Sequence, residues 1–422
     1  MYRKTVLENG VKIISEHLDH MKTVSVGIWV NVGSRDEVKP ENGVSHFIEH
    51  MAFKGTYNRN ALQIAKELDA IGGLNNAFTG KENTCFHATV LGKHFFKASE
   101  LLSDIFLNPV LDMRDIERER QVILQEISMT EDSPGDSIHD FFDLVFWQDH
   151  PMGMPVLGTQ ETVSAITRKT IVDYLKRLYT PERVLIAAAG NVDHKNMVSF
   201  FRPLFESAEK SALPAGRNTP EPAADVCMRF KDLEQVHICL GGQAPSLRDR
   251  KRFAAAVFNA ILGGNMSSRL FQKIRETQGL AYSVYSYMSS YVDVGLMSVY
   301  FATDPVNMNP ALETVNAEIL KIVRGDISEK DLEDAIEYLI GGLYISSEST
   351  ESRMVRIAKN EIVFDRYVPY EEIVSGLEQI TLDQVVQVAN EIFCSSKVSM
   401  AVLGPVDSDM LNKDIINLTK AL

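Results

Sequence analysis

The chain has 422 residues, 45% of them hydrophobic, and a formal net charge of −14. This length exceeds what one ordinary hydrophobic core supports, so we expect two domains, and the acidic balance argues against nucleic acid as a partner. No stretch approaches the roughly 18 apolar residues that span a bilayer, and no signal-peptide pattern follows the charged start. We therefore expect a cytoplasmic protein without a membrane anchor.

The first half of the chain alternates strand and helix patterns. Apolar residues at period two predict strands, and apolar residues at helical spacing predict helices. The expected strands are 12–16, 23–32, 75–79, 84–91 and 184–190. The expected helices are 45–53, 61–71, 93–107, 112–131, 135–147, 168–179 and 195–205.

The second half repeats this order of elements. Residues 211–224 contain three prolines and few large apolar side chains, which is typical of a linker. Beyond them we expect strands over 225–231, 235–242, 282–291, 294–302 and 398–404, helices over 249–262 and 267–276, and three longer helical stretches before the last strand. Because the strands 398–404 and 184–190 are each followed by Val-Asp and a final helix, we interpret the chain as an internal duplication. It would form two tandem, similar α/β domains, 1–210 and 225–422.

The helix over 45–53 carries His46, Glu49 and His50 in the pattern H-x-x-E-H. His46 and His50 are four residues apart and project from one helix face, so both can bind one ion. A single histidine on an apolar helix is more often a structural residue, but two histidines and a glutamate in this register favour a metal site. Catalytic zinc usually has three protein ligands and a fourth position open for water.

A third ligand is expected on the helix over 112–131. Glu119 and Glu126 are seven residues apart and face the same way, whereas Glu117 and Glu131 fall elsewhere and are expected to be solvated. Glu126 follows the apolar residues 122–124, so we expect it to be buried beside the metal. The second half has no H-x-x-E-H at its equivalent helix, which predicts one metal ion per chain.

These residues and their spacing resemble the pitrilysin-like zinc peptidases, in particular the mitochondrial processing peptidase branch and its bacterial relatives. The resemblance implies an α+β fold in which each domain has a mostly antiparallel sheet covered by helices. It also implies that His46, His50 and Glu126 bind zinc, that Glu49 is the general base, and that Glu119 supports the site from outside. A set of two histidines and a glutamate would also accept manganese or cobalt.

The same resemblance suggests how a peptide would bind. Asn76, Ala77, Phe78 and Thr79 correspond to an edge strand that pairs with the substrate backbone, although an ordinary interior strand would show the same pattern. Arg275 and Tyr282 correspond to a pair that contacts the substrate and the reacting carbonyl. In longer family members this pair and the zinc site come from different halves, so we expect a homodimer in which Arg275 and Tyr282 serve the partner's zinc.

Other histidines and the cysteines are expected to have structural roles. None of them has a second ligand residue at metal-binding spacing, and no C-x-x-C pair occurs. The histidines in question are His87, His94, His139 and His150, and the cysteines are Cys85, Cys227, Cys239 and Cys394.

The predicted function is that of a zinc-dependent metalloendopeptidase acting on peptides or unfolded segments inside a dimeric chamber, with basic peptides favoured by the acidic composition. An alternative is a non-catalytic structural or substrate-presenting subunit. Such subunits usually lack one or more metal-site residues, whereas this chain retains them all. A zinc hydrolase acting on a small molecule is a third hypothesis, which would require a narrow pocket.

Overall fold

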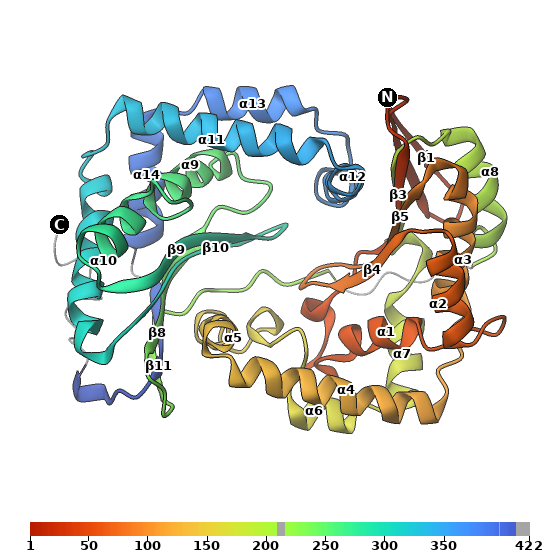
Figure 1. The fold of residues 1–422 in the computed structure, drawn as a ribbon, viewed down its shortest axis with the longest axis horizontal. Helices are drawn as coiled ribbons and strands as arrows, with labels where there is room; N and C mark the ends of the chain where they lie inside the picture. Colours follow the sequence, from red (N-terminus) through yellow and green to blue (C-terminus); the bar gives the residue numbers. More distant parts are fainter. Residues whose placement is uncertain (209–215, 396, 411–422) are drawn as a thin grey trace. The chain divides into compact units, whose positions relative to one another are not determined.

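The computed structural model describes residues 1–208, 216–395 and 397–410 (Figure 1). The chain divides into two compact units, each built from three segments. Unit 1 consists of Met1–Met129, Met154–Asn218 and Ile345–Val368, and unit 2 consists of Thr130–Gly153, Thr219–Tyr344 and Pro369–Leu422. Part of the expected linker, residues 211–215, lies outside the described residues.

Unit 1 contains a six-stranded sheet. Its strands are β1 (Tyr2–Val6), β2 (Lys12–His17), β3 (Thr23–Val30), β4 (Leu74–Thr79), β5 (Thr84–Leu91) and β6 (Val184–Gly190). They lie in the order β1-β2-β6-β3-β5-β4, and all neighbours are antiparallel except β2 and β6. Strand β4 is therefore an edge strand, paired with β5 along one side.

The helices of unit 1 cover both faces of this sheet. They are α1 (Val44–Ala52), α2 (Ala61–Ala70), α3 (Phe95–Leu107), α4 (Met113–Asp132), α6 (Gln160–Ala165), α7 (Arg168–Leu178), α8 (His194–Phe205) and α12 (Thr350–Phe364). Helices α3 and α8 pack on the face that carries Val24, Val26 and Ile28. Helix α12 packs on the opposite face, against Trp29 and Cys85.

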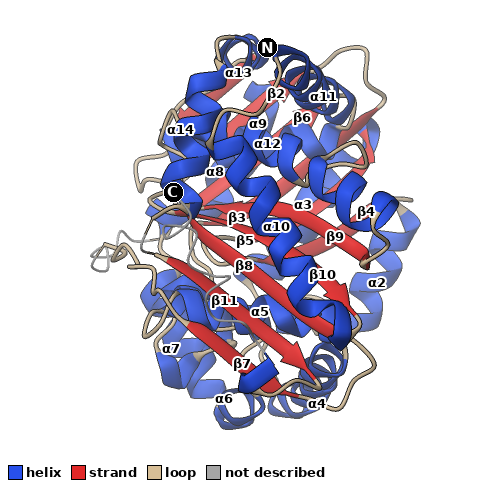
Figure 2. Ribbon diagram, turned by 90° about the vertical axis from the view of Figure 1, so that its left-hand side faces the viewer, coloured by secondary structure: helices blue, strands red, loops and turns tan. Residues whose placement is uncertain are grey.

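Unit 2 contains a five-stranded sheet, whose strands are seen side by side in Figure 2. They are β7 (Val226–Phe230), β8 (Val236–Ala244), β9 (Ala281–Ser290), β10 (Gly295–Thr303) and β11 (Val398–Gly404), in the order β7-β11-β8-β10-β9. Only β7 and β11 are parallel among these described pairs. The helices are α5 (Pro134–Phe146), α9 (Arg252–Leu262), α10 (Met308–Val323), α11 (Glu329–Ser347), α13 (Tyr370–Glu378) and α14 (Leu382–Phe393).

The two sheets share one topology. Leaving out β1, the strands of each unit lie in the order first, last, second, fourth, third along the chain, and the first and last strands form the parallel pair. This common order agrees with the internal duplication expected from the sequence. The α+β class with mostly antiparallel, helix-covered sheets is confirmed.

The units do not coincide with the continuous ranges 1–210 and 225–422 expected from the sequence. Helix α5 comes from the first half but packs on the unit 2 sheet, where Ile138 and Phe142 share one buried cluster with Cys239 and Leu403. Helix α12 comes from the second half but packs on the unit 1 sheet. Each sheet face would otherwise expose apolar side chains, so each unit depends on a helix from the other half of the chain.

Several local features differ from the expected elements. In the part of the chain that the structure describes, five helices (α10 to α14) lie between β10 and β11, where three longer helical stretches were expected. Strand β1 was not predicted, because its residues are mostly polar and exposed. The short helix α6 was not predicted either. The segment expected as a helix over 267–276 is a π-helix over Phe271–Thr277, in which Gln278 N donates to the Lys273 carbonyl five residues earlier. Among the described residues, no helix combines the length and apolar character that crossing a membrane requires.

We predict that Ile357→Ala destabilises unit 1, although residue 357 lies in the second half of the sequence. Ile357 is 1% exposed and packs in the cluster that contains Trp29, so its truncation should lower the free energy of unfolding by about 2–5 kcal/mol. Urea unfolding followed by Trp29 fluorescence in a Trp147→Phe background measures this loss. As a matched control, Ile392→Ala removes an equally buried isoleucine from unit 2. If Ile392→Ala changes the Trp29 unfolding transition and Ile357→Ala does not, the prediction is contradicted.

Candidate metal centre

Helix α1 is held in place by its apolar face. Val44, Phe47, Ile48 and Met51 recur at helical spacing and are all buried. They pack with residues of α4 and α7, among them Ile116, Ile123, Ile127, Ile171 and Leu178. This packing fixes the rotation of α1 about its axis, and therefore the direction in which its two histidines point.

A buried carboxylate holds the N-terminus of α1. Glu37 is 2% exposed and accepts hydrogen bonds from the backbone N–H groups of Gly43 (2.8 Å) and Ser45 (2.8 Å). The Asn42 side chain also donates to it, at 3.0 Å. Burial raises the pKa of Glu37 to about 7, against the opposing effect of these hydrogen bonds. The carboxylate satisfies helix N–H groups that have no partner within the helix.

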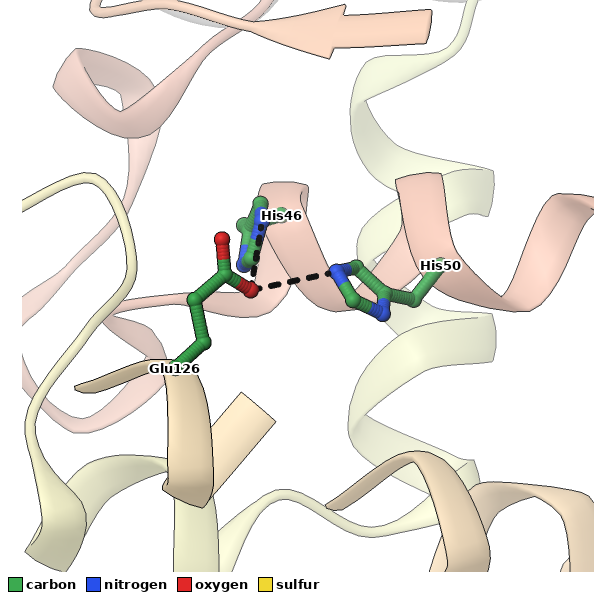
Figure 3. A group of neighbouring side chains, drawn as sticks. All are labelled: His46, His50 and Glu126. Atoms are coloured by element: carbon green, nitrogen blue, oxygen red, sulfur yellow. Dashed lines mark ion pairs between the residues drawn. The ribbon is translucent and has the colours of Figure 1, made fainter. Parts of the chain in front are cut away.

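Three predicted ligands converge between α1 and α4 (Figure 3). Glu126 Oε2 lies 3.7 Å from His46 Nε2 and 3.5 Å from His50 Nε2. Zinc bonds of about 2.0–2.2 Å in a tetrahedron place ligand atoms roughly 3.3–3.6 Å apart, so the observed spacing suits one zinc ion. Among the described residues, no other three His, Cys, Asp or Glu side chains meet at comparable distances.

Glu119 lies next to this triad, on the same side of α4. Its Oε2 is 3.3 Å from His50 Nδ1, and its Oε1 is 2.8 Å from Lys54 Nζ. A carboxylate that accepts from the second ring nitrogen orients the imidazole and selects the tautomer whose Nε2 is available to a metal. Lys54 supplies the positive charge that such a buried carboxylate needs, because the Glu119 side chain is 4% exposed.

The burial of the two glutamates differs from expectation. We expected Glu126 to be buried beside the metal, but its side chain is 44% exposed, while Glu119 is the buried one. The apolar residues next to Glu126 in the sequence do not all face inward: Ile123 is buried, whereas Val122 is 41% exposed. Glu126 thus lies at the solvent-facing rim of the triad.

Glu49 projects from α1 close to the two histidines. Burial raises its pKa, and a 2.6 Å hydrogen bond donated by the Thr79 hydroxyl to Glu49 Oε2 opposes that increase. Burial, together with the neighbouring His50, also lowers the pKa of His46 to about 4. At neutral pH His46 is therefore an uncharged imidazole, the form that coordinates metal.

Strand β4, which contains Asn76, Ala77 and Phe78, has an open edge. In an antiparallel pair of strands, hydrogen-bonded residue pairs alternate with pairs that form no backbone hydrogen bond to each other. Gly80 N donates to the Asn83 carbonyl across the turn to β5, so Gly80 and Asn83 form a hydrogen-bonded pair and the next pair, Thr79 and Thr84, does not. The backbone groups of Ala77 and Thr79 then point away from β5. In agreement, the Ala77 N–H is bonded to the Asn76 side chain at 2.9 Å.

Arg275 and Tyr282, the other predicted pair, lie in unit 2. The Arg275 guanidinium carbon is 4.2 Å from the centre of the Tyr282 ring and 4.8 Å from that of Phe271. Arg275 belongs to the π-helix, and Gly279, at φ +62°, forms the turn that leads into β9. Tyr282 is 74% exposed, so the pair is available to a ligand.

Two residues at the centre, Glu37 and Lys54, were missed by the sequence-based interpretation, and Thr79 was expected only as part of the edge strand, without its contact to Glu49. Lys54 and Thr79 make their contacts through the tertiary fold, since Lys54 is 65 positions from Glu119 and Thr79 is 30 from Glu49. Glu37, in contrast, contacts Gly43 and Ser45, only six and eight residues further along the chain. A carboxylate shortly before an apolar helix was the one local signal that could have indicated Glu37.

We predict that the metal-free protein loses stability as the pH falls from about 6.5 towards 4, in part because of His46. Its pKa is lower in the folded state than in the unfolded chain, so in this window the unfolded state binds more protons. The loss should approach about 3 kcal/mol at the acidic end. Urea unfolding in EDTA measures it at several pH values.

Other histidines with lowered pKa values add to this slope, namely His87, His139, His194 and His237. The informative quantity is therefore the difference between the wild type and His46→Gln. An identical slope for the two proteins would show that His46 does not contribute.

The chain is similar to known proteases along nearly its whole length. The family model described as Insulinase (Peptidase family M16) matches residues 12–160, and that described as Peptidase M16 inactive domain matches residues 165–339. An uncharacterized zinc protease of Mycobacterium leprae is 41% identical over 413 residues, covering 96% of this chain and 92% of the relative. An uncharacterized zinc protease of Bacillus subtilis is 37% identical over 405 residues, covering 96% and 98%.

A solved structure has the same fold. The crystal structure of a protease from Helicobacter pylori matches with a TM-score of 0.89 at 22% identity, covering 96% of this chain and 99% of that chain. The Insulinase model matches the part of the sequence that contains the H-x-x-E-H helix and Glu126, and the inactive-domain model covers most of the part that lacks them. The chain belongs to the pitrilysin-like M16 family of zinc metallopeptidases.

Proposed function

We propose that this protein is a zinc-dependent endopeptidase that cleaves extended peptides or unfolded segments. The observation that carries the proposal is the convergence of His46, His50 and Glu126 around one point, with Glu49 on the same helix. The names of the M16 relatives support a zinc protease. A role as a non-catalytic subunit is not favoured, because the complete set of metal-site residues is present and assembled.

The residues have distinct tasks in this mechanism. His46, His50 and Glu126 would hold zinc, which supplies Lewis-acid activation of water and of the peptide carbonyl. Glu49 accepts the proton of the attacking water and then delivers it to the leaving amine. Glu119 and Lys54 keep the His50 ring in its binding orientation.

The substrate class follows from the open edge of β4. Backbone N–H and C=O groups on a strand edge can pair with any extended chain, whatever its side chains. The hydroxyl of Thr79 contacts Glu49, so this edge runs directly to the catalytic base. An extended peptide fits such an edge better than a small molecule does. The net charge of −14 favours basic peptides.

Glu49→Gln should abolish peptide cleavage while zinc binding is retained. Removing a general base costs about 10²–10⁴-fold in rate, and glutamine keeps the shape of the side chain. Turnover of a quenched fluorescent peptide library and bound zinc, measured by elemental analysis, test this expectation. Glu126→Gln serves as the comparison that should lose zinc as well as activity.

Glu117→Gln is the matched control, because Glu117 lies on α4 but bonds to Arg120 at the surface. Cleavage by Glu49→Gln at the wild-type rate would refute the assigned base. Bound zinc without cleavage in the wild type itself would refute the peptidase proposal and support a non-catalytic role.

We further propose a homodimer in which Arg275 and Tyr282 of one chain serve the zinc site of the other, where they would orient the peptide and stabilise the oxyanion. The contact of Arg275 with the exposed Tyr282 ring supports a role in ligand contact. The enclosed chamber and the cytoplasmic location stay predictions from the sequence.

Mixing two inactive variants tests the shared site. A dimer of Glu49→Gln and Arg275→Ala chains contains one site with an intact base and an intact arginine only if the arginine acts across the dimer. We therefore expect activity to reappear when the separately inactive variants are mixed and allowed to exchange subunits. If Arg275 serves its own chain, the mixture stays inactive although mixed dimers are detected by native mass spectrometry.

A further inference from the structure

Thr79 contacts the catalytic base directly. Its hydroxyl donates to Glu49 Oε2 at 2.6 Å, while the Ser45 carbonyl oxygen lies 3.5 Å away, at the limit of a hydrogen bond. A hydroxyl has one proton to donate, so the short contact to the carboxylate is the dominant interaction. The Thr79 side chain is available for it because β4 alternates, and Ala77 and Thr79 face α1 while Phe78 packs against Trp29 on the other side.

The backbone of the same residue lies on the open edge. Because hydrogen-bonded pairs alternate from Gly80–Asn83 onward, the backbone N–H and C=O groups of Ala77 and Thr79 point away from β5. An extended peptide added to this edge would pair with those groups. Thr79 thus belongs both to the peptide-binding edge, through its backbone, and to the catalytic base, through its hydroxyl.

We infer that Thr79 is a positioning residue that sets the location of the Glu49 carboxylate relative to the bound peptide. The inference rests on the proposed peptidase function. With Oε2 held by Thr79, Oε1 is the oxygen left to accept the proton of the attacking water. Because threonine is β-branched and stiff at χ1, its hydroxyl is fixed relative to the strand that carries the substrate. A single residue, Thr79, then positions both the scissile carbonyl and the catalytic base.

Thr79→Val removes the hydroxyl and keeps the shape and the backbone. We expect kcat to fall about 10- to 100-fold, the size expected for the loss of a hydrogen bond to a charged group, with KM and zinc content unchanged and the protein still folded. Thr79→Ser keeps the donor and should retain most of the wild-type kcat. Thr84→Val is the matched control: Thr84 is the cross-strand neighbour of Thr79, and its hydroxyl donates to the Val32 carbonyl instead of to Glu49.

A fall in kcat that is specific to Thr79→Val and rescued by serine supports the inference. An unchanged kcat, an equal fall in Thr84→Val, or a fall matched by loss of zinc overturns it. Crystal structures of the zinc-loaded wild type and Thr79→Val provide a readout that needs no activity. If the wild type cleaves no peptide, the proposed peptidase function is refuted. The positioning role is then decided by whether the Glu49 carboxylate moves in Thr79→Val, as we expect, or stays in place, which overturns it.

Discussion

The packing of α1 against α4 is the contact on which the rest of the centre depends. Two of the ligands come from α1 and the third from α4, so the triad forms only if both helices keep their rotation and their axial position. A shift of one residue along α1 would rotate His46 and His50 by about 100° and separate them from Glu126. The buried residues Phe47, Met51 and Ile123 resist such a shift, because the interior around them is close-packed.

Helix α1 has nine residues, too few to be stable alone in water. Its order comes from the tertiary structure: the apolar face packs against α4 and α7, and Glu37 binds the N–H groups at its start. The cost of burying the Glu37 carboxylate is offset by three hydrogen bonds that orient the first turn. The metal-binding helix is thus fixed along its side and at one end.

The duplicated units keep the scaffold and differ in the site. Helix α9 occupies the place in unit 2 that α1 has in unit 1, but it carries alanines, Val257 and Phe258 instead of metal ligands. Unit 2 offers the Arg275–Tyr282 pair, in which the exposed Tyr282 belongs to the edge strand β9. Because α5 and α12 are exchanged between the halves, neither half of the sequence contains all the helices that cover its own sheet. Neither half of the sequence, taken as a continuous segment, can therefore bury both faces of its sheet.

The sequence by itself determined the local features of this protein. Periodicity located most helices and strands, the i, i+4 spacing placed His46 and His50 on one face, and the seven-residue spacing put Glu119 and Glu126 on one side of α4. These features depend on neighbours within a few residues. The order of elements likewise revealed the duplication, because the second half of the chain repeats the order of the first.

The tertiary structure decided what depends on contacts between distant residues. Whether Glu119 or Glu126 is buried follows from how α4 packs, and no spacing rule contains that information. That β4 is an edge strand, that Thr79 reaches Glu49, and that α12 covers the unit 1 sheet are properties of pairing and packing across many residues. The direction in which side chains point along one helix or strand follows from its periodicity. The residues that these side chains contact depend on how the elements pack together.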